Sequence, residues 1–184
     1  MDWDNQPVPF RMYEGAPQIQ LPLMNGDRGR PYSALYESNE DSPATISIES
    51  VANILELSMG LSAWKKFQSS EWALRMNPSS GNLHPTECYL VLPDLPDQRA
   101  CVTHYDPYRH VLEARALLDG DQSEGLKSCG GFGIILTSVL WREAWKYGER
   151  AYRYCQHDLG HALGALRYAC NLNGWKSTLI PQVT

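Results

Sequence analysis

Arg75-Met-Asn-Pro-Ser-Ser-Gly-Asn-Leu-His-Pro-Thr-Glu-Cys-Tyr-Leu-Val-Leu92 is the stretch that decides the fold. Its second half, residues 87–92, alternates in the way typical of a β-strand. Its first half is a turn-rich loop in which Gly81 can adopt a positive φ, so that neighbouring backbone N–H groups are free to point at one bound group. With two hydroxyls and an amide, such a loop suits a planar, acceptor-rich cofactor better than a metal. By residue type alone, a solvated turn is the simpler interpretation.

Residues 78–87, Pro-Ser-Ser-Gly-Asn-Leu-His-Pro-Thr-Glu, resemble the flavin-facing loop of the FMN-dependent nitroreductase family. The closer match is the SagB-type dehydrogenase branch, which includes azoline oxidases and also has an Arg before the loop and a Tyr after it, here Arg75 and Tyr89. A second similarity, in residues 173–178, is to the family's loop after its central helix, which approaches the flavin ring. The resemblance therefore implies FMN as cofactor, bound by Arg75, Pro78, Ser79, Ser80, Gly81, Asn82, Gly174 and Trp175.

Composition indicates an ordinary soluble globular domain. The 184 residues are 43% hydrophobic and 20% charged, with a net charge of -5, and no basic patch suggests nucleic acid as a partner. No apolar run is long enough to span a bilayer, and the N-terminus lacks the features of a signal peptide. The five cysteines lie at no metal-clip spacing, which favours free thiols in a reducing compartment. We therefore expect a cytoplasmic protein.

The order of the elements predicts an α+β fold: a nitroreductase-like mixed sheet flanked by helices and completed by dimerisation. Residues 1–45 carry six prolines and predict an extended arm that wraps another surface or is partly disordered. Residues 46–184 are expected to form the FMN-binding domain. Within it we expect a helix from Ser47 to Gly60, a turn at 63–67, a strand at 87–92, and a hairpin of two strands at 101–105 and 111–115. Further along we expect a helix at 121–127, a central strand at 132–140, a helical stripe at 141–155 that is interrupted by Gly148, a second helical stripe at 159–170, and a strand at 177–180.

The run Lys146-Tyr-Gly-Glu-Arg150 also resembles the SagB-type branch, in whose azoline oxidases the adjacent Lys and Tyr are the catalytic pair. Lys146 and Tyr147 are therefore implied as catalytic. Azoline oxidation needs a proton removed from a ring carbon while hydride leaves to the flavin. A Lys near other cations, here the arginines at 142, 150 and 153, is pushed toward its neutral, basic form, and a Tyr beside it can relay the proton. The alternative from residue type is a solvated helix face.

His157 and His161 lie four apart on a predicted helix and share a face. The pattern differs from that of zinc proteases because Asp158 replaces glutamate and no third ligand follows in a chain that ends at Thr184. We therefore expect no metal, and interpret both histidines as core or interface residues.

Two features depart from the family pattern. The FMN phosphate is commonly held by an Arg-x-Ser-x-Arg segment, for which Arg28, Arg30 and Ser33 are the only near candidates and do not match. The chain also stops just after the flavin loop, which suggests a truncated domain.

We expect an FMN-dependent oxidoreductase that transfers hydride between flavin and a small-molecule or peptide substrate, either by azoline oxidation or by NAD(P)H-dependent reduction of nitro or quinone compounds. The expected assembly is a homodimer that uses the Gly160/Gly164 groove, and the alternative function is a flavin-free binding or scaffold partner.

Overall fold

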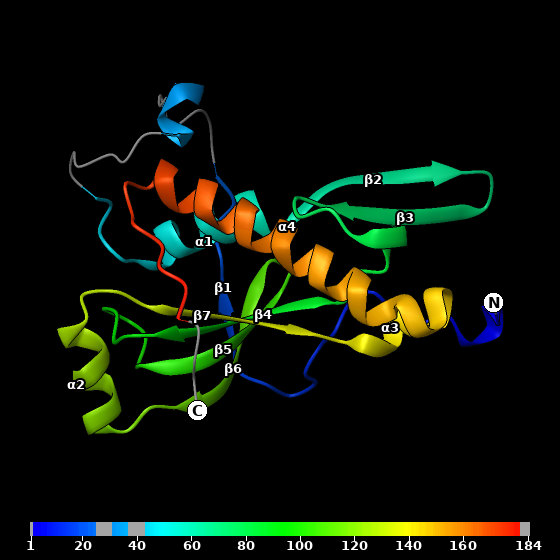
Figure 1. Cartoon of the computed structure of the whole chain (residues 1–184). Helices are drawn as coiled ribbons and strands as arrows, with labels where there is room; N and C mark the ends of the chain where they lie inside the picture. The colour runs from blue at the N-terminus through cyan, green and yellow to red at the C-terminus, as the bar shows by residue number, and fades with distance from the viewer. Residues whose placement is uncertain (1, 25–30, 37–42, 181–184) are drawn as a thin grey trace.

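The computed structural model describes residues 2–24, 31–36 and 43–180, which form a helix-covered antiparallel sheet with a projecting hairpin (Figure 1). The sheet has the strand order β1-β6-β5-β4-β7. All pairings among the described strands are antiparallel, so the α+β class is confirmed and the mixed sheet is not formed within this part of the chain. The strands are β1 (Gln18–Gln20), β4 (Thr86–Leu92), β5 (Cys101–Asp106), β6 (Val111–Leu117) and β7 (Gly133–Ser138).

Two helices, α1 (Ile48–Ser58) and α4 (Ala151–Leu172), pack on one face of the sheet and enclose the core. Helix α1 begins at Ser47, as predicted, because Ser47 and Ser50 satisfy each other's backbone N–H groups in a capping box. The two helices are joined by a buried hydrogen bond of 2.9 Å from Asn173 Nδ2 to Asn53 Oδ1. The core between helices and sheet includes Val51, Ile54, Leu55, Leu90, Leu92, Leu112, Ala162 and Leu166.

Helix α3 (Leu140–Tyr147) runs into α4 through a sharp bend at Gly148. The backbone there has φ 55° and ψ −127°, a conformation that glycine adopts without the steric cost of a side chain. A 3₁₀ turn, η4 (Gly148–Arg150), follows, so the helical segment divides at the predicted interruption at Gly148, and the expected second helical stripe at 159–170 continues α4 without a break. Helix α2 (Gly120–Ser128), capped by Asp119, and the β5–β6 hairpin match their predictions.

Three other predictions were wrong. Residues expected to form a turn at 63–67 belong to β2 (Leu61–Phe67), which pairs with β3 (Ser70–Arg75) in a hairpin that projects from the body (Figure 1). Strand β7 lies at an edge of the sheet rather than at its centre, and Ile135 on it is 47% exposed. Residues 177–180 form no strand. An apolar run predicts a strand, but whether that strand lies at the centre or at the edge of the sheet depends on which other strands pair with it.

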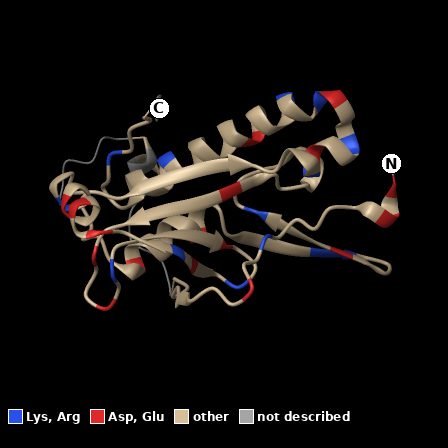
Figure 2. Ribbon diagram, turned by 90° about the horizontal axis from the view of Figure 1, so that it is seen from below, with Lys and Arg blue, Asp and Glu red and all other residues tan. Residues whose placement is uncertain are grey.

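The N-terminal arm lies on the sheet of its own chain. Its strand β1 pairs with β6, which was not predicted because the segment is short. Its backbone carbonyls at Val8 and Pro9 accept hydrogen bonds from Arg142 Nε (3.0 Å) and Arg75 Nη2 (2.5 Å). Acidic and basic residues are dispersed over helices, strands and loops (Figure 2). None of the described helices is long and apolar enough to cross a membrane.

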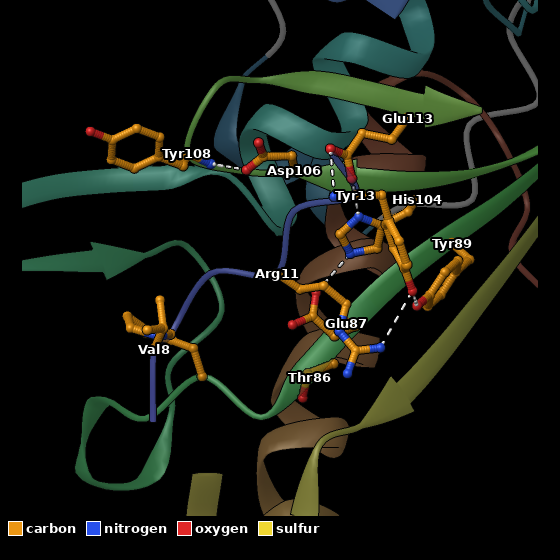
Figure 3. A network of polar contacts seen from close by, with 12 residues as sticks. Val8, Arg11, Tyr13, Thr86, Glu87, Tyr89, His104, Asp106, Tyr108 and Glu113 are labelled. Atoms are coloured by element: carbon orange, nitrogen blue, oxygen red, sulfur yellow. Dashed lines mark hydrogen bonds and ion pairs between the residues drawn. The ribbon is translucent and has the colours of Figure 1, made fainter. Parts of the chain in front are cut away.

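The arm covers a buried polar network centred on His104 (Figure 3). His104 Nδ1 lies 2.9 Å from Glu113 Oε2, and His104 Nε2 lies 2.8 Å from Glu87 Oε2. Arg142 Nη1 lies 2.5 Å from the other oxygen of Glu87. The Tyr13 ring closes the network from the arm, 5.1 Å from the His104 ring. Burial opposes ionisation of Glu87, but the His104 hydrogen bond and the charges of Arg142 and Arg75 lower its pKa overall.

Replacing Arg142 with Met should destabilise the fold by about 3–5 kcal/mol, because the change leaves the buried Glu87 carboxylate without its cationic partner. The matched control is Arg167→Met on the exposed side of α4, which should change the free energy of unfolding by no more than about 0.5 kcal/mol. Urea denaturation followed by circular dichroism measures both. Equal stability of the two variants would contradict a structural role for the network.

Candidate functional site

The loop at residues 78–82 lies against the C-terminal turn of α3. Gly81 has φ +62°, and a Cβ placed on it would lie 2.6 Å from Tyr147 Oη and 2.9 Å from Lys146 Nζ. The structure thus brings the predicted cofactor loop and the predicted catalytic pair together, although they are far apart in the sequence. A side chain at residue 81 would collide with both functional groups.

The two loop serines are held by Asp158 of α4. Ser79 Oγ donates to Asp158 Oδ2 at 2.8 Å, while Ser80 N and Ser80 Oγ donate to Oδ1 at 2.9 and 2.8 Å. The expectation that the N–H groups around this loop are free for a bound group is therefore wrong at Ser80. It is also wrong at Asn82, whose backbone N–H donates to Ser79 O at 3.1 Å and whose Nδ2 donates to Ala73 O at 2.9 Å. Sequence reasoning considered Asp158 only as part of a metal pattern, and missed this role.

Arg75 and Tyr89 lie outside this cluster, on the side covered by the arm. Arg75 is buried, donates to Thr86 O and Pro9 O, and has its pKa lowered to about 10 by burial. The Tyr89 hydroxyl lies 2.7 Å from the Tyr13 hydroxyl. Both side chains stabilise the strand and the arm that flank the loop.

The predicted flavin residues Gly174 and Trp175 lie beyond the far end of α4. Trp175 Nε1 donates to Ala44 O at 2.6 Å, and its ring packs on Phe132. At 1.5 Å per residue, the end of α4 is roughly 20 Å along the helix axis from Asp158. One copy of the chain therefore does not bring the two predicted flavin segments together. Arg28 and Arg30, considered for the phosphate, lie outside the described residues.

Lys146 is exposed, whereas Tyr147 is partly buried against Tyr154 at a ring separation of 4.3 Å. Burial raises the pKa of Tyr147, and the charges of Glu143 and Asp158 raise it further. The expected cationic surroundings of Lys146 form only in part, because Arg142 turns away and pairs with Glu87. Arg150 lies over the Tyr154 ring, 5.9 Å from its centroid.

Glu143 is a buried acid that sequence reasoning missed. It has 0% exposure, and neither carboxyl oxygen has a hydrogen-bond partner among the described residues. Burial and the nearby charge of Asp158 raise its pKa to about 7, while Lys146 opposes the shift. A signal was present in the sequence, because Glu143 precedes Lys146 and Tyr147 by three and four residues and so shares their helix face.

His157 and His161 are both exposed, so neither is a core histidine. Within the described ranges, no group of three or more His, Cys, Asp and Glu side chains is placed to hold a metal ion. The absence of bound metal in solution stays a prediction.

Glu143→Gln should become more stable relative to the wild type as the pH rises from about 5 to 7. The raised pKa means that the folded wild type binds this proton more tightly than the unfolded chain does, so wild-type stability falls over that range, whereas Gln cannot ionise. The difference should grow by about 1–3 kcal/mol, since one pKa unit corresponds to about 1.4 kcal/mol. Denaturation at a series of pH values measures it, with the exposed Glu149→Gln as control. If the free energies of unfolding of the wild type and Glu143→Gln changed with pH in parallel, the raised pKa assigned to Glu143 would be contradicted.

Comparisons with known proteins agree with this fold. No family model matches the chain. It is 32% identical to the trifolitoxin-processing protein TfxB of Rhizobium leguminosarum bv. trifolii, over 52% of this chain and 29% of that protein. A structure assigned as a nitroreductase from Anabaena variabilis has a TM-score of 0.66 and 30% identity, over 90% of this chain and 33% of the other. This chain thus spans about a third of the length of these two relatives.

Two further structures share the fold alone. One is assigned as a nitroreductase from Ralstonia eutropha, with a TM-score of 0.58 and 16% identity, over 89% of this chain and 80% of the other. The other is the E. coli microcin synthetase McbBCD complex with truncated pro-MccB17 bound, with a TM-score of 0.50 and 18% identity, over 85% of this chain and 64% of that chain. The chain therefore has the nitroreductase fold, and the resemblance to the nitroreductase family predicted from its loop and its Lys-Tyr pair is confirmed.

Proposed function

We propose that the chain is the FMN-binding part of an oxidoreductase of the SagB-type branch, which transfers hydride between flavin and a peptide or small-molecule substrate. The observation that carries the proposal is the contact of Gly81 with the functional groups of Lys146 and Tyr147. A loop that resembles a flavin-binding loop and a pair that resembles a proton-transfer pair meet at one place. Bound FMN would supply a centre that accepts or donates hydride, and the chain would supply binding and proton transfer.

The residues present fit FMN at the backbone edge of the loop. The missing side chain of Gly81 leaves room for the ends of Lys146 and Tyr147 directly beside the loop, and the Asp158 hydrogen bonds hold the loop in one conformation before any ligand binds. Gly81 would hold the ring through its backbone N–H and Pro78 through its carbonyl, whereas Ser79, Ser80 and Asn82, whose donors are used within the protein, would act by fixing the loop. Such preorganisation avoids the entropy cost of ordering a loop on binding.

The separation of the two predicted flavin segments favours a homodimer. Gly174 and Trp175 lie too far along α4 to share a ligand with Gly81 of the same copy. In the proposed assembly they would reach the flavin of a second copy, and the edge strand β7, with its exposed Ile135, would be covered there.

Proton transfer is assigned to Lys146 and Tyr147. In the oxidative direction, Lys146 Nζ would take the proton that leaves the substrate carbon as hydride leaves a neighbouring atom. Tyr147, which is partly buried beside Lys146, would pass that proton toward solvent. In the reductive direction the same groups would supply a proton to the substrate.

Azoline oxidation of a peptide is the preferred reaction, because TfxB is named for trifolitoxin processing and shares 32% identity with this chain. Reduction of nitro or quinone compounds with NAD(P)H is favoured instead by the neighbour assigned as a nitroreductase. A flavin-free scaffold role has one observation in its favour: the Ser79 and Ser80 donors are already used by Asp158. The proposed location is the cytoplasm, where reduced nicotinamide cofactors are available and free cysteine thiols persist.

Purified chain titrated with FMN should bind it near stoichiometry, and Gly81→Val should abolish binding without unfolding the protein. The valine would be strained at φ +62° and would collide with Tyr147 and Lys146. Gly130→Val is the matched control, since Gly130 has φ +63° but an added Cβ there meets nothing within 4 Å. Flavin fluorescence quenching measures binding, and circular dichroism checks the fold. A wild-type chain that never binds FMN would favour the scaffold function.

Lys146→Ala should lower turnover about 10²–10⁴-fold, the usual contribution of a general base, while FMN content stays unchanged. Tyr147→Phe should cost less if the hydroxyl serves only as a relay. Lys127→Ala, which removes an exposed lysine paired with Asp94, is the control and should leave turnover unchanged. Substrates come from a screen of azoline peptides and of nitro and quinone acceptors. Unchanged turnover in Lys146→Ala and Tyr147→Phe would refute the assigned proton transfer.

A further inference from the structure

Glu143 is a buried ionisable group that the proposed reaction does not use, and it lies next to the Lys146–Tyr147 pair. Its carboxyl group is fully buried, and neither oxygen is hydrogen-bonded within the described part of the chain. A buried carboxylate without partners is costly, whereas a neutral carboxylic acid in the same place costs far less. The position therefore favours a group that holds a proton in the folded protein.

Charged and titratable groups face Glu143 from both helices at this site. On its own helix α3, Lys146 and Tyr147 follow one turn later and share its face. From α4, the charge of Asp158 acts on Glu143, and the Cys155 thiol lies close enough that burial, and then the charge of Glu143, raise its pKa. Asp158 accepts hydrogen bonds from Ser79 and Ser80, which stabilise its negative charge. Because two neighbouring carboxylates repel each other, the one without donors keeps its proton.

We propose that Glu143 is a positioning residue for the Lys146–Tyr147 pair. Its buried carboxyl group carries a proton in the resting protein, and the gain or loss of that proton controls how readily the Tyr147 hydroxyl releases its own proton. Only a proton moves in this step. It passes between Glu143 Oε and solvent, and Glu143 changes between a neutral acid and a carboxylate.

The coupling has a definite sign. An ionised Glu143 places a negative charge near the Tyr147 hydroxyl and disfavours a second negative charge there. A neutral Glu143 removes that penalty, so Tyr147 releases its proton more readily. The loop takes part as well, because Gly81 contacts the ends of Tyr147 and Lys146, and Asp158 fixes the loop while it acts on Glu143.

The contribution to turnover rests on the proposed function, whereas the coupling between Glu143 and Tyr147 does not. The primary test therefore follows Tyr147 itself, by NMR of protein labelled with ¹³C at tyrosine Cζ, with the signal assigned by its loss in Tyr147→Phe. The variants are Glu143→Gln and Glu143→Met, both of which remove the charge. Whichever of them keeps the wild-type circular dichroism spectrum is used, and Glu149→Gln on the exposed side is the control.

We expect the pKa of Tyr147 to fall by about half a unit or more in the folded Glu143 variant, the size expected for a unit charge several ångströms away in a partly solvated site. Glu149→Gln should leave it unchanged, and Glu143→Asp, which keeps the charge, should keep it near the wild-type value. An unchanged Tyr147 titration in a folded Glu143→Gln or Glu143→Met protein would overturn the inference.

The second readout is the pH profile of turnover with any active substrate. The basic limb of the profile should move to lower pH in Glu143→Gln by the same shift that NMR reports for Tyr147, with FMN binding unchanged. A purely structural role of Glu143 would lower activity equally at all pH values, and would count against the inference. A Tyr147 shift in a chain without flavin or turnover would support the coupling while refuting the proposed function. Turnover combined with an unchanged Tyr147 titration would support the proposed function and refute the coupling.

Discussion

The position of Arg142 is the constraint on which the rest of the structure depends. Its guanidinium donates to a carbonyl of the arm at Val8, to a carbonyl of the loop at His84, and to the carboxylate of Glu87 on β4. One side chain on α3 thus joins the N-terminal arm, the loop that precedes β4 and the buried network around His104. Because the contacts are charge-assisted and nearly closed to water, α3 has little freedom to move relative to the sheet.

The orientation of α3 then decides what the other residues of that helix can do. With Arg142 directed at the sheet, Glu143 is directed into the interface with α4, and Lys146 and Tyr147 reach Gly81 one turn later. The helix ends at once, at the bend of Gly148, and α4 returns with Asp158 placed to hold the loop serines. Two short segments and one loop therefore form a compact site with very few residues.

The polar groups of the loop have a different use from the one their chemistry suggests. Hydroxyls and an N–H group that could bind an acceptor-rich ligand instead bind a carboxylate of the protein, and so determine the loop's shape. What the site offers a ligand is then a fixed backbone edge with no side chain at Gly81, next to an amine and a phenol. The proposed flavin chemistry would use this fixed backbone edge together with the neighbouring amine and phenol. In the proposed coupling, the buried carboxyl group of Glu143 would add a charge near Lys146 and Tyr147 that is present or absent with its proton.

The sequence alone determined the elements whose signals are local: the capped helix that begins at Ser47, the strand after the loop, the β5–β6 hairpin and the bend at Gly148. Those signals arise from neighbouring residues, through helix caps, strand alternation and glycine conformation. It also identified the loop and the Lys-Tyr pair by their resemblance to one family. The tertiary structure decided that β7 is an edge strand, that residues 61–75 form a projecting hairpin, and that Asp158 rather than a ligand holds Ser79 and Ser80. Each of these outcomes depends on contacts between segments far apart in the chain, which sequence periodicity does not encode.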